Sequence, residues 1–82
     1  MSAAAVVKNL AAERLNVPLA QLDAANTLRE AGIDSLAAID LVVTIEDRLG
    51  IRFGDGDLEA MRSFEDVAAT VERLLATKHA AP

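Results

Sequence analysis

Cysteine is absent from this chain of 82 residues, and aromatic side chains are nearly absent, with two Phe and neither Trp nor Tyr. Without cysteine there is no disulfide framework and no thiolate metal site, so any thiol chemistry has to come from a cofactor. The core has to be built from Leu, Val, Ile and Ala. A chain this short supports one domain, which we expect to cover residues 1–82, with an ordered core over about 3–77 and a frayed tail over 78–82.

Long apolar runs and positive charge are also scarce. No stretch approaches the roughly 20 apolar residues that a membrane-spanning helix needs, and the first residues lack the basic-then-apolar pattern of a secretion signal. We therefore expect a cytoplasmic protein without a membrane span, and we expect a monomer. Eight Lys and Arg against thirteen Asp and Glu give a net charge of −5, which argues against nucleic acid as a partner. One histidine without cysteine cannot form a transition-metal cage, so no metal site is predicted.

Apolar residues recur at helical spacing in three parts of the chain, and no part shows the alternation of a half-buried strand. Helices are predicted over residues 3–15 and 35–49, the second ending at Gly50 as a left-handed cap. A single helical turn is predicted over 57–62, and Ser63 is predicted to cap the last helix, with an acid three residues on. The predicted fold is all-α: a small four-helix bundle with a long first loop and a short third helix.

The connection over residues 17–34 is long for a small bundle, in which short loops are the norm and long ordered ones are often functional. Within it, Thr27-Leu28-Arg29-Glu30 has the form of a capping box. This pattern predicts one short helical turn, which Gly32 would then end.

The predicted helix over 35–49 carries two apolar stripes on nearly opposite sides, counted at about 100° per residue. One stripe consists of Leu41, Ile45 and Leu49. The other consists of Leu36, Ile39 and Val43, and it is bordered by Asp40, Glu46 and Asp47. A bundle helix needs only one stripe for the core. The second is therefore either covered by the long preceding loop or forms a surface on which a partner protein docks.

The run Gly32-Ile33-Asp34-Ser35-Leu36 places a hydroxyl at the start of that helix. A helix N-terminus offers unpaired N–H groups and the positive end of the macrodipole, so a serine there can carry an anionic phosphate. The structural alternative is capping, because Asp and Ser are both excellent N-caps. Two capping residues in succession are redundant for capping alone, and Ala38 stands where the capping-box partner of Ser35 would be.

The segment from Leu28 to Leu36, followed by Ile39-Asp40-Leu41, resembles the prosthetic-group site of acyl carrier proteins, and the similarity covers nearly the whole chain. The resemblance implies that Ser35 receives 4′-phosphopantetheine from coenzyme A through a phosphodiester. The thiol of this arm would carry acyl or aminoacyl groups as thioesters, which explains how a chain without cysteine takes part in thioester chemistry. The protein itself would be a carrier and not an enzyme.

Other positions acquire roles from the same resemblance. Asp34 would be recognised by the phosphopantetheinyl transferase that modifies the serine. The positions that match the family's partner-docking residues are Leu36, Ile39, Asp40, Val43, Glu46 and Asp47. Further partners would be an acyl- or aminoacyl-loading enzyme and a ketosynthase, condensation or other tailoring enzyme.

Three departures from the pattern of housekeeping fatty-acid carriers favour a specialised pathway. Ala37 and Ala38 stand at positions that are often acidic or polar, and Ala31 replaces a common Leu. The run Gly54-Asp55-Gly56-Asp57 replaces the more usual Pro-containing entry to the third helix. By analogy we favour a carrier for polyketide, hybrid polyketide-peptide or other natural-product assembly, including antibiotic biosynthesis. A housekeeping fatty-acid carrier is the alternative.

Two interpretations of another class are also open. The run Gly32 to Leu36 superficially resembles the Gly-Asp-Ser-Leu motif of a hydrolase family, but Ile33 is inserted. The sole candidate base, His79, lies in the predicted frayed tail, and a nucleophilic serine needs a positioned base. A helical adaptor that is never modified would share the apolar helix and the acidic border. It would not need Ser35.

Overall fold

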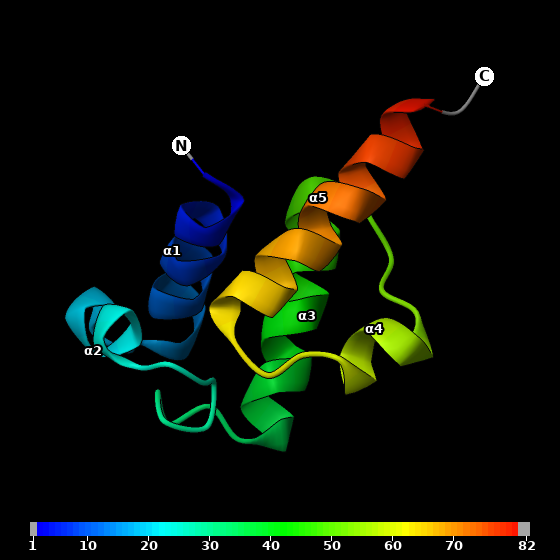
Figure 1. The fold of residues 1–82 in the computed structure, drawn as a ribbon. Coiled ribbons are helices and arrows are strands. Elements are labelled where there is room, and N and C mark those ends of the chain that lie inside the picture. Colours follow the sequence, from blue (N-terminus) through cyan, green and yellow to red (C-terminus); the bar gives the residue numbers. More distant parts are fainter. Residues whose placement is uncertain (1, 81–82) are drawn as a thin grey trace.

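The computed structural model describes residues 2–80 of the chain, with side chains described to residue 78. These residues contain five helices joined by turns and loops. They are α1 (Ala3–Leu15), α2 (Leu19–Ala24), α3 (Ser35–Leu49), α4 (Asp55–Glu59) and α5 (Phe64–Ala80). No strand occurs among these residues. In the same part of the chain, every helix is too short or too polar to cross a bilayer. The predicted all-α fold class is confirmed, with α1, α3, α4 and α5 as the four helices of the bundle (Figure 1).

Helix α1 is central to the bundle, since it packs against α2, α3 and α5 (Figure 1). The core is largely aliphatic, as the composition requires. Its largest fully buried side chains are Val7, Leu22, Leu41, Ile45, Phe64, Val67 and Val71. Burying one large apolar side chain contributes roughly 1.5–3 kcal/mol. All of these side chains except Leu22 lie in the three helices that the apolar spacing predicts.

Helices α1 and α3 begin and end where the sequence predicts. Helix α1 is capped by Ser2, whose Oγ accepts the N–H of Ala5 at 3.1 Å, and it ends at Asn16 in the left-handed conformation. Helix α3 ends at Gly50, which has a φ of 67°. Glycine adopts this conformation without the steric cost that a Cβ imposes, so the predicted C-cap of α3 is confirmed.

The connection over residues 17–34 is not all loop, because it contains α2 (Figure 1). This helix has six residues and follows Pro18, and it contributes one fully buried side chain, Leu22, to the core. Proline is favoured at the start of a helix, where its missing N–H is not needed. A segment of fewer than two turns shows too little periodicity to be recognised, so the sequence pattern did not predict α2 within the long connection.

The short third helix of the prediction lies at Asp55–Glu59 instead of 57–62. Its early start has a local cause: the side chain of Asp57 accepts the backbone N–H of Gly54 at 2.9 Å and so caps the helix at Gly54. The sequence pattern placed the start after the two glycines, because glycine is a poor helix former.

Helix α5 is capped as predicted. Ser63 Oγ accepts the N–H of Asp66 at 3.1 Å, and the Asp66 carboxylate accepts the N–H of Ser63 at 3.1 Å, which forms a reciprocal capping box. The helix reaches Ala80, so its backbone continues through the first residues of the expected tail. Residues 81 and 82 of that tail lie outside the described residues, and fraying of the chain end stays a prediction.

Candidate functional site

A hydrogen-bonded turn over residues 28–32 precedes α3, as the capping box at Thr27 to Glu30 predicts. Thr27 Oγ1 accepts the N–H of Glu30 at 3.0 Å, and Glu30 Oε1 reaches back to the N–H of Asn26 at 3.2 Å. The turn ends at Gly32, which has a φ of +87°. The N–H of Ile33 donates to the carbonyl oxygen of Leu28 at 2.9 Å, which closes the turn as a Schellman motif. The chain is thereby reversed just before α3.

This turn is fixed to the rest of the molecule. Its apolar side chains, Leu28, Ala31 and Ile33, are buried in the core. The backbone N–H of Leu28 donates to the carbonyl oxygen of Arg62, at 2.9 Å, in the connection between α4 and α5. The side-chain amide of Gln21 in α2 donates to the carbonyl oxygen of Ala31, also at 2.9 Å. The residues that lead into α3 are therefore held by α2 and by the connection between α4 and α5.

The two candidate capping residues at the start of α3 have different roles. Asp34 is the N-cap: its Oδ1 accepts the N–H of Ala37 at 2.8 Å. Ser35 is the first residue of the helix and is exposed, and its hydroxyl has no hydrogen-bond partner among the described residues. The other serines, Ser2 and Ser63, both use their Oγ atoms as caps. Among the described residues, Ser35 is thus the one serine whose hydroxyl is left available.

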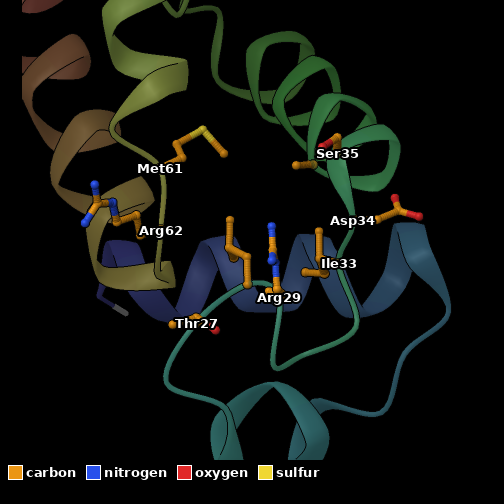
Figure 2. Close-up of a pocket in the computed structure, with 9 residues that line it drawn as sticks. Thr27, Arg29, Ile33, Asp34, Ser35, Met61 and Arg62 are labelled. Carbon is orange, nitrogen blue, oxygen red and sulfur yellow. The ribbon is translucent and has the colours of Figure 1, made fainter.

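A hollow of about 370 Å³ lies beside Ser35 (Figure 2). Its walls come from the turn before α3, the start of α3 and the connection between α4 and α5: Thr27, Leu28, Arg29, Ile33, Asp34, Ser35, Ala38, Met61 and Arg62. A smaller hollow of about 330 Å³ on the same loop again includes Ser35, together with Arg29, Gly32, Ile33 and Asp34. A group bound to the Ser35 oxygen would have space on the protein surface next to it.

The second apolar stripe of α3 is not covered by the preceding loop. Leu36 is 79% exposed, Ile39 57% and Val43 47%, whereas Leu41 and Ile45 of the first stripe are fully buried. The loop instead directs its own apolar side chains into the core beside α1 and α5. Of the two alternatives for this stripe, the structure therefore shows the open one.

The three acids that border this stripe are held differently. Asp40 Oδ1 forms an ion pair with Arg14 Nε at 3.0 Å. Glu46 is half-buried, and its Oε2 accepts the N–H of Phe53 at 2.8 Å, which fastens the loop after α3. Asp47 is exposed and has no ion pair among the described residues. Only Asp47 therefore offers a carboxylate that is free of internal contacts.

Three residues of the site were not recognised from the sequence. Arg29 is part of the capping box and of the motif that carries the resemblance, but no role was assigned to its side chain. Met61 and Arg62 belong to a connection far along the chain from Ser35. Their place beside the serine depends on tertiary contacts such as the bond from Leu28 to Arg62. No local sequence signal reports such a contact.

Comparison with known proteins defines the class. Residues 5–71 match the family model for the phosphopantetheine attachment site. The chain belongs to this family, so its cofactor is covalent 4′-phosphopantetheine and it is a carrier and not an enzyme.

Individual relatives agree with this assignment. The chain is 33% identical over 70 residues to the acyl carrier protein of Thermotoga maritima, covering 84% of this chain and 86% of the relative. It is 34% identical over 73 residues to the acyl carrier protein homolog of Mycoplasma genitalium, covering 88% and 87%. The crystal structure of the Thermotoga maritima acyl carrier protein superimposes with a TM-score of 0.79 at 31% identity, over 90% of this chain and 87% of that one. The resemblance drawn from the motif is confirmed.

The residues present fit such a prosthetic group. The Ser35 hydroxyl is exposed and unbonded, and it lies in the first turn of α3, where the helix dipole favours a negative phosphate. The neighbouring hollow supplies space, and the N-cap formed by Asp34 does not use the serine oxygen.

Proposed function

We propose that this protein is an acyl carrier that bears its 4′-phosphopantetheine on Ser35 and presents the attached group to partner enzymes. The observation that carries the proposal is that adjacent residues at the start of α3 have different roles: Asp34 caps the helix, and the Ser35 hydroxyl is exposed and makes no hydrogen bond. Its position within the matched family region and the names of the similar proteins support it.

The arm supplies a thiol that carries acyl or aminoacyl groups as thioesters, which the chain itself cannot do because it lacks cysteine. The protein's own contribution is to hold the attachment oxygen. The buried turn before α3 and the Asp34 cap fix the backbone on both sides of Ser35. The positive end of α3 lowers the cost of placing a phosphate there, typically by about 0.3–1 kcal/mol for a surface group.

We propose the exposed stripe of α3 as the surface that partners recognise. Leu36, Ile39 and Val43 offer apolar anchors that no part of the described chain covers. Asp40, Glu46 and Asp47 lie along its borders, and Asp34 precedes the serine where a modifying enzyme has to approach. A basic partner surface would be attracted by these acids, which affects the rate of encounter more than the final affinity. The proposed partners are a phosphopantetheinyl transferase, a loading enzyme and a ketosynthase, condensation or tailoring enzyme.

For the pathway we propose natural-product assembly, with fatty-acid synthesis as the competing assignment. The support is the family analogy at Ala31, Ala37 and Ala38, where small side chains stand at positions that are often larger or polar. In the structure Ala37 and Ala38 are half-buried, and Ala31 is fully buried beneath the turn. Loading the protein with acyl groups of different classes by their own loading enzymes would separate the two pathways.

Modification of the purified protein tests the attachment. Incubation with coenzyme A and a promiscuous phosphopantetheinyl transferase should add one phosphopantetheinyl group to the wild type, measured by intact mass, and Ser35→Ala should abolish the addition. Ser2→Ala and Ser63→Ala are matched controls, because their hydroxyls are helix caps, and both should still accept the group. A folded wild type that stays unmodified would favour the alternative of a helical adaptor.

A further inference from the structure

Most of the basic side chains of this acidic protein are already engaged. The ion pairs are Lys8 with Asp23, Arg14 with Asp40, Arg48 with Glu13 and Arg73 with Asp57. Lys78 Nζ donates to the carbonyl oxygen of Leu49 at 3.3 Å. Among the described side chains this leaves the guanidinium groups of Arg29, Arg52 and Arg62 without an internal partner. Two of these three, Arg29 and Arg62, line the hollow beside Ser35.

The two arginines differ in how they face the hollow. In Figure 2, Arg29 projects from the turn toward the space between Met61 and Ser35. Arg62 lies across the hollow, with its guanidinium turned outward. Arg29 also lines the smaller hollow together with Ser35. Arg29 is therefore the cation that projects into the hollow that Ser35 lines, and Arg62 is a second cation at the opposite wall of the same hollow.

The carboxylates nearest to the hollow, those of Asp34 and Glu30, form hydrogen bonds elsewhere and do not pair with the two arginines. Asp34 also lines the hollow, but its Oδ1 is bonded to the N–H of Ala37, and Figure 2 shows its carboxylate pointing away from the centre. Glu30 is held at the other end of the turn by Asn26 and Thr27. A guanidinium with free donors suits the geometry of a phosphate or a carboxylate, to which it can donate two parallel hydrogen bonds.

We propose that Arg29, assisted by Arg62, forms an anion subsite beside Ser35 that binds an oxyanion of the attached group. That oxyanion is either the phosphodiester that joins the arm to Ser35 or a carboxylate on the cargo. The inference rests on the proposed attachment at Ser35 and extends it, because it assigns a role to two cations that neither cap a helix nor pair with an acid.

Arginine side-chain NMR on the whole protein tests this subsite. Nε–Hε resonances are recorded for the unmodified protein, for the form bearing 4′-phosphopantetheine, and for forms loaded with a butyryl or a malonyl group, which are similar in size and differ in the terminal carboxylate. If the phosphodiester is the ligand, the Arg29 resonance moves on modification and butyryl adds nothing. If a cargo carboxylate is the ligand, it moves with malonyl and not with butyryl. In either case Arg52 stays in place, and the displacement shrinks in 1 M salt, where the Debye length is ~3 Å.

Variants give a second readout, in which the phosphorus resonance of the phosphodiester and the Arg62 resonance are compared between the modified wild type and the modified variants. Arg29→Gln should change the phosphorus resonance most, Arg62→Gln should change it by a smaller amount, and Arg52→Gln, the matched control, should leave it unchanged. The subsite would be overturned if intact mass showed complete modification while the Nε–Hε resonances of Arg29 and Arg62 shifted no more than that of Arg52 in every form. The attachment at Ser35 would then still stand. Failure of wild type to gain the group would overturn both. An effect of Arg29→Gln that appears only in the rate of the transferase would assign Arg29 to partner binding instead.

Discussion

The carboxylate of Asp34 accepts the backbone N–H of Ala37 at 2.8 Å, so the residue before the serine, and not the serine, caps α3. This single bond has two consequences. It satisfies an N–H at the start of the helix, and it leaves the hydroxyl of Ser35 exposed. Asp34 therefore provides the cap, and the Ser35 hydroxyl remains free for the proposed attachment.

Substitution of Asp34 should separate its cap from its charge. Asp34→Ala should lower the free energy of unfolding by about 1 kcal/mol, because the N–H of Ala37 loses its acceptor. Asp34→Asn should keep most of that stability, since Asn caps as well as Asp, and should still slow modification if the transferase needs the negative charge. Urea unfolding and the rate of modification measure the two effects. Equal rates for Asn and wild type would show that the charge has no part in recognition.

The exposed stripe of α3 should tolerate charge without loss of the fold. Leu36→Asp and Val43→Asp should change the free energy of unfolding by less than about 1 kcal/mol, because these side chains are exposed. Both should reduce transfer of the cargo to partner enzymes.

The buried stripe provides the control. Leu41→Ala, at a fully buried position of the same helix, should cost about 2–5 kcal/mol. Circular dichroism and denaturant titration compare the three variants. Unfolding of the Leu36 or Val43 variant would show that the second stripe is part of the core and would end its proposed role in docking.

The acids Glu46 and Asp47 should have distinct effects although they are neighbours. Glu46→Ala should destabilise the protein by about 1 kcal/mol, because the N–H of Phe53 loses its acceptor, and Glu46→Gln should restore most of this. Asp47→Asn should leave stability unchanged, since its side chain has no internal contact, and should slow association with a basic partner at low salt. Stopped-flow binding at two salt concentrations measures the second effect. Salt-independent rates for wild type would contradict it.

The turn before Ser35, the proposed attachment residue, should depend on Gly32. Its φ of +87° lies in the left-handed region, so Gly32→Ala should lower the free energy of unfolding by roughly 1–2 kcal/mol and slow modification of Ser35. Gly56→Ala in α4 is the matched control. A Cβ there meets nothing within 4 Å, and the change should be neutral or stabilising by up to about 1 kcal/mol. Equal thermal stability of the two variants would contradict the role given to Gly32.

Much of this fold is predictable because its boundaries are local. The start of α3 at Ser35, its end at Gly50 and the cap of α5 at Ser63 all follow from residues within four positions of each boundary. Helix α2 escapes prediction because six residues show no period, and its one buried side chain, Leu22, has meaning only against the core.

The candidate site divides in the same way. The two stripes of α3 can be found from spacing, and Ser35 is proposed as the attachment residue from the resemblance of its motif to acyl carrier proteins. Whether the second stripe is open depends on where the preceding loop places Leu28, Ala31 and Ile33, which no local pattern decides. The presence of Arg62 at the hollow depends on a backbone bond to Leu28 that spans the chain.

Site mapping after modification tests the central claim most directly. Trypsin cleaves after Arg29 and Arg48, so one peptide contains both Ser35 and Thr44, whose hydroxyl already donates to the carbonyl oxygen of Asp40 at 2.9 Å. Fragmentation of this peptide from the protein treated with coenzyme A and the transferase should place the whole phosphopantetheinyl mass on Ser35. Its location on Thr44 or on any other peptide would contradict the account.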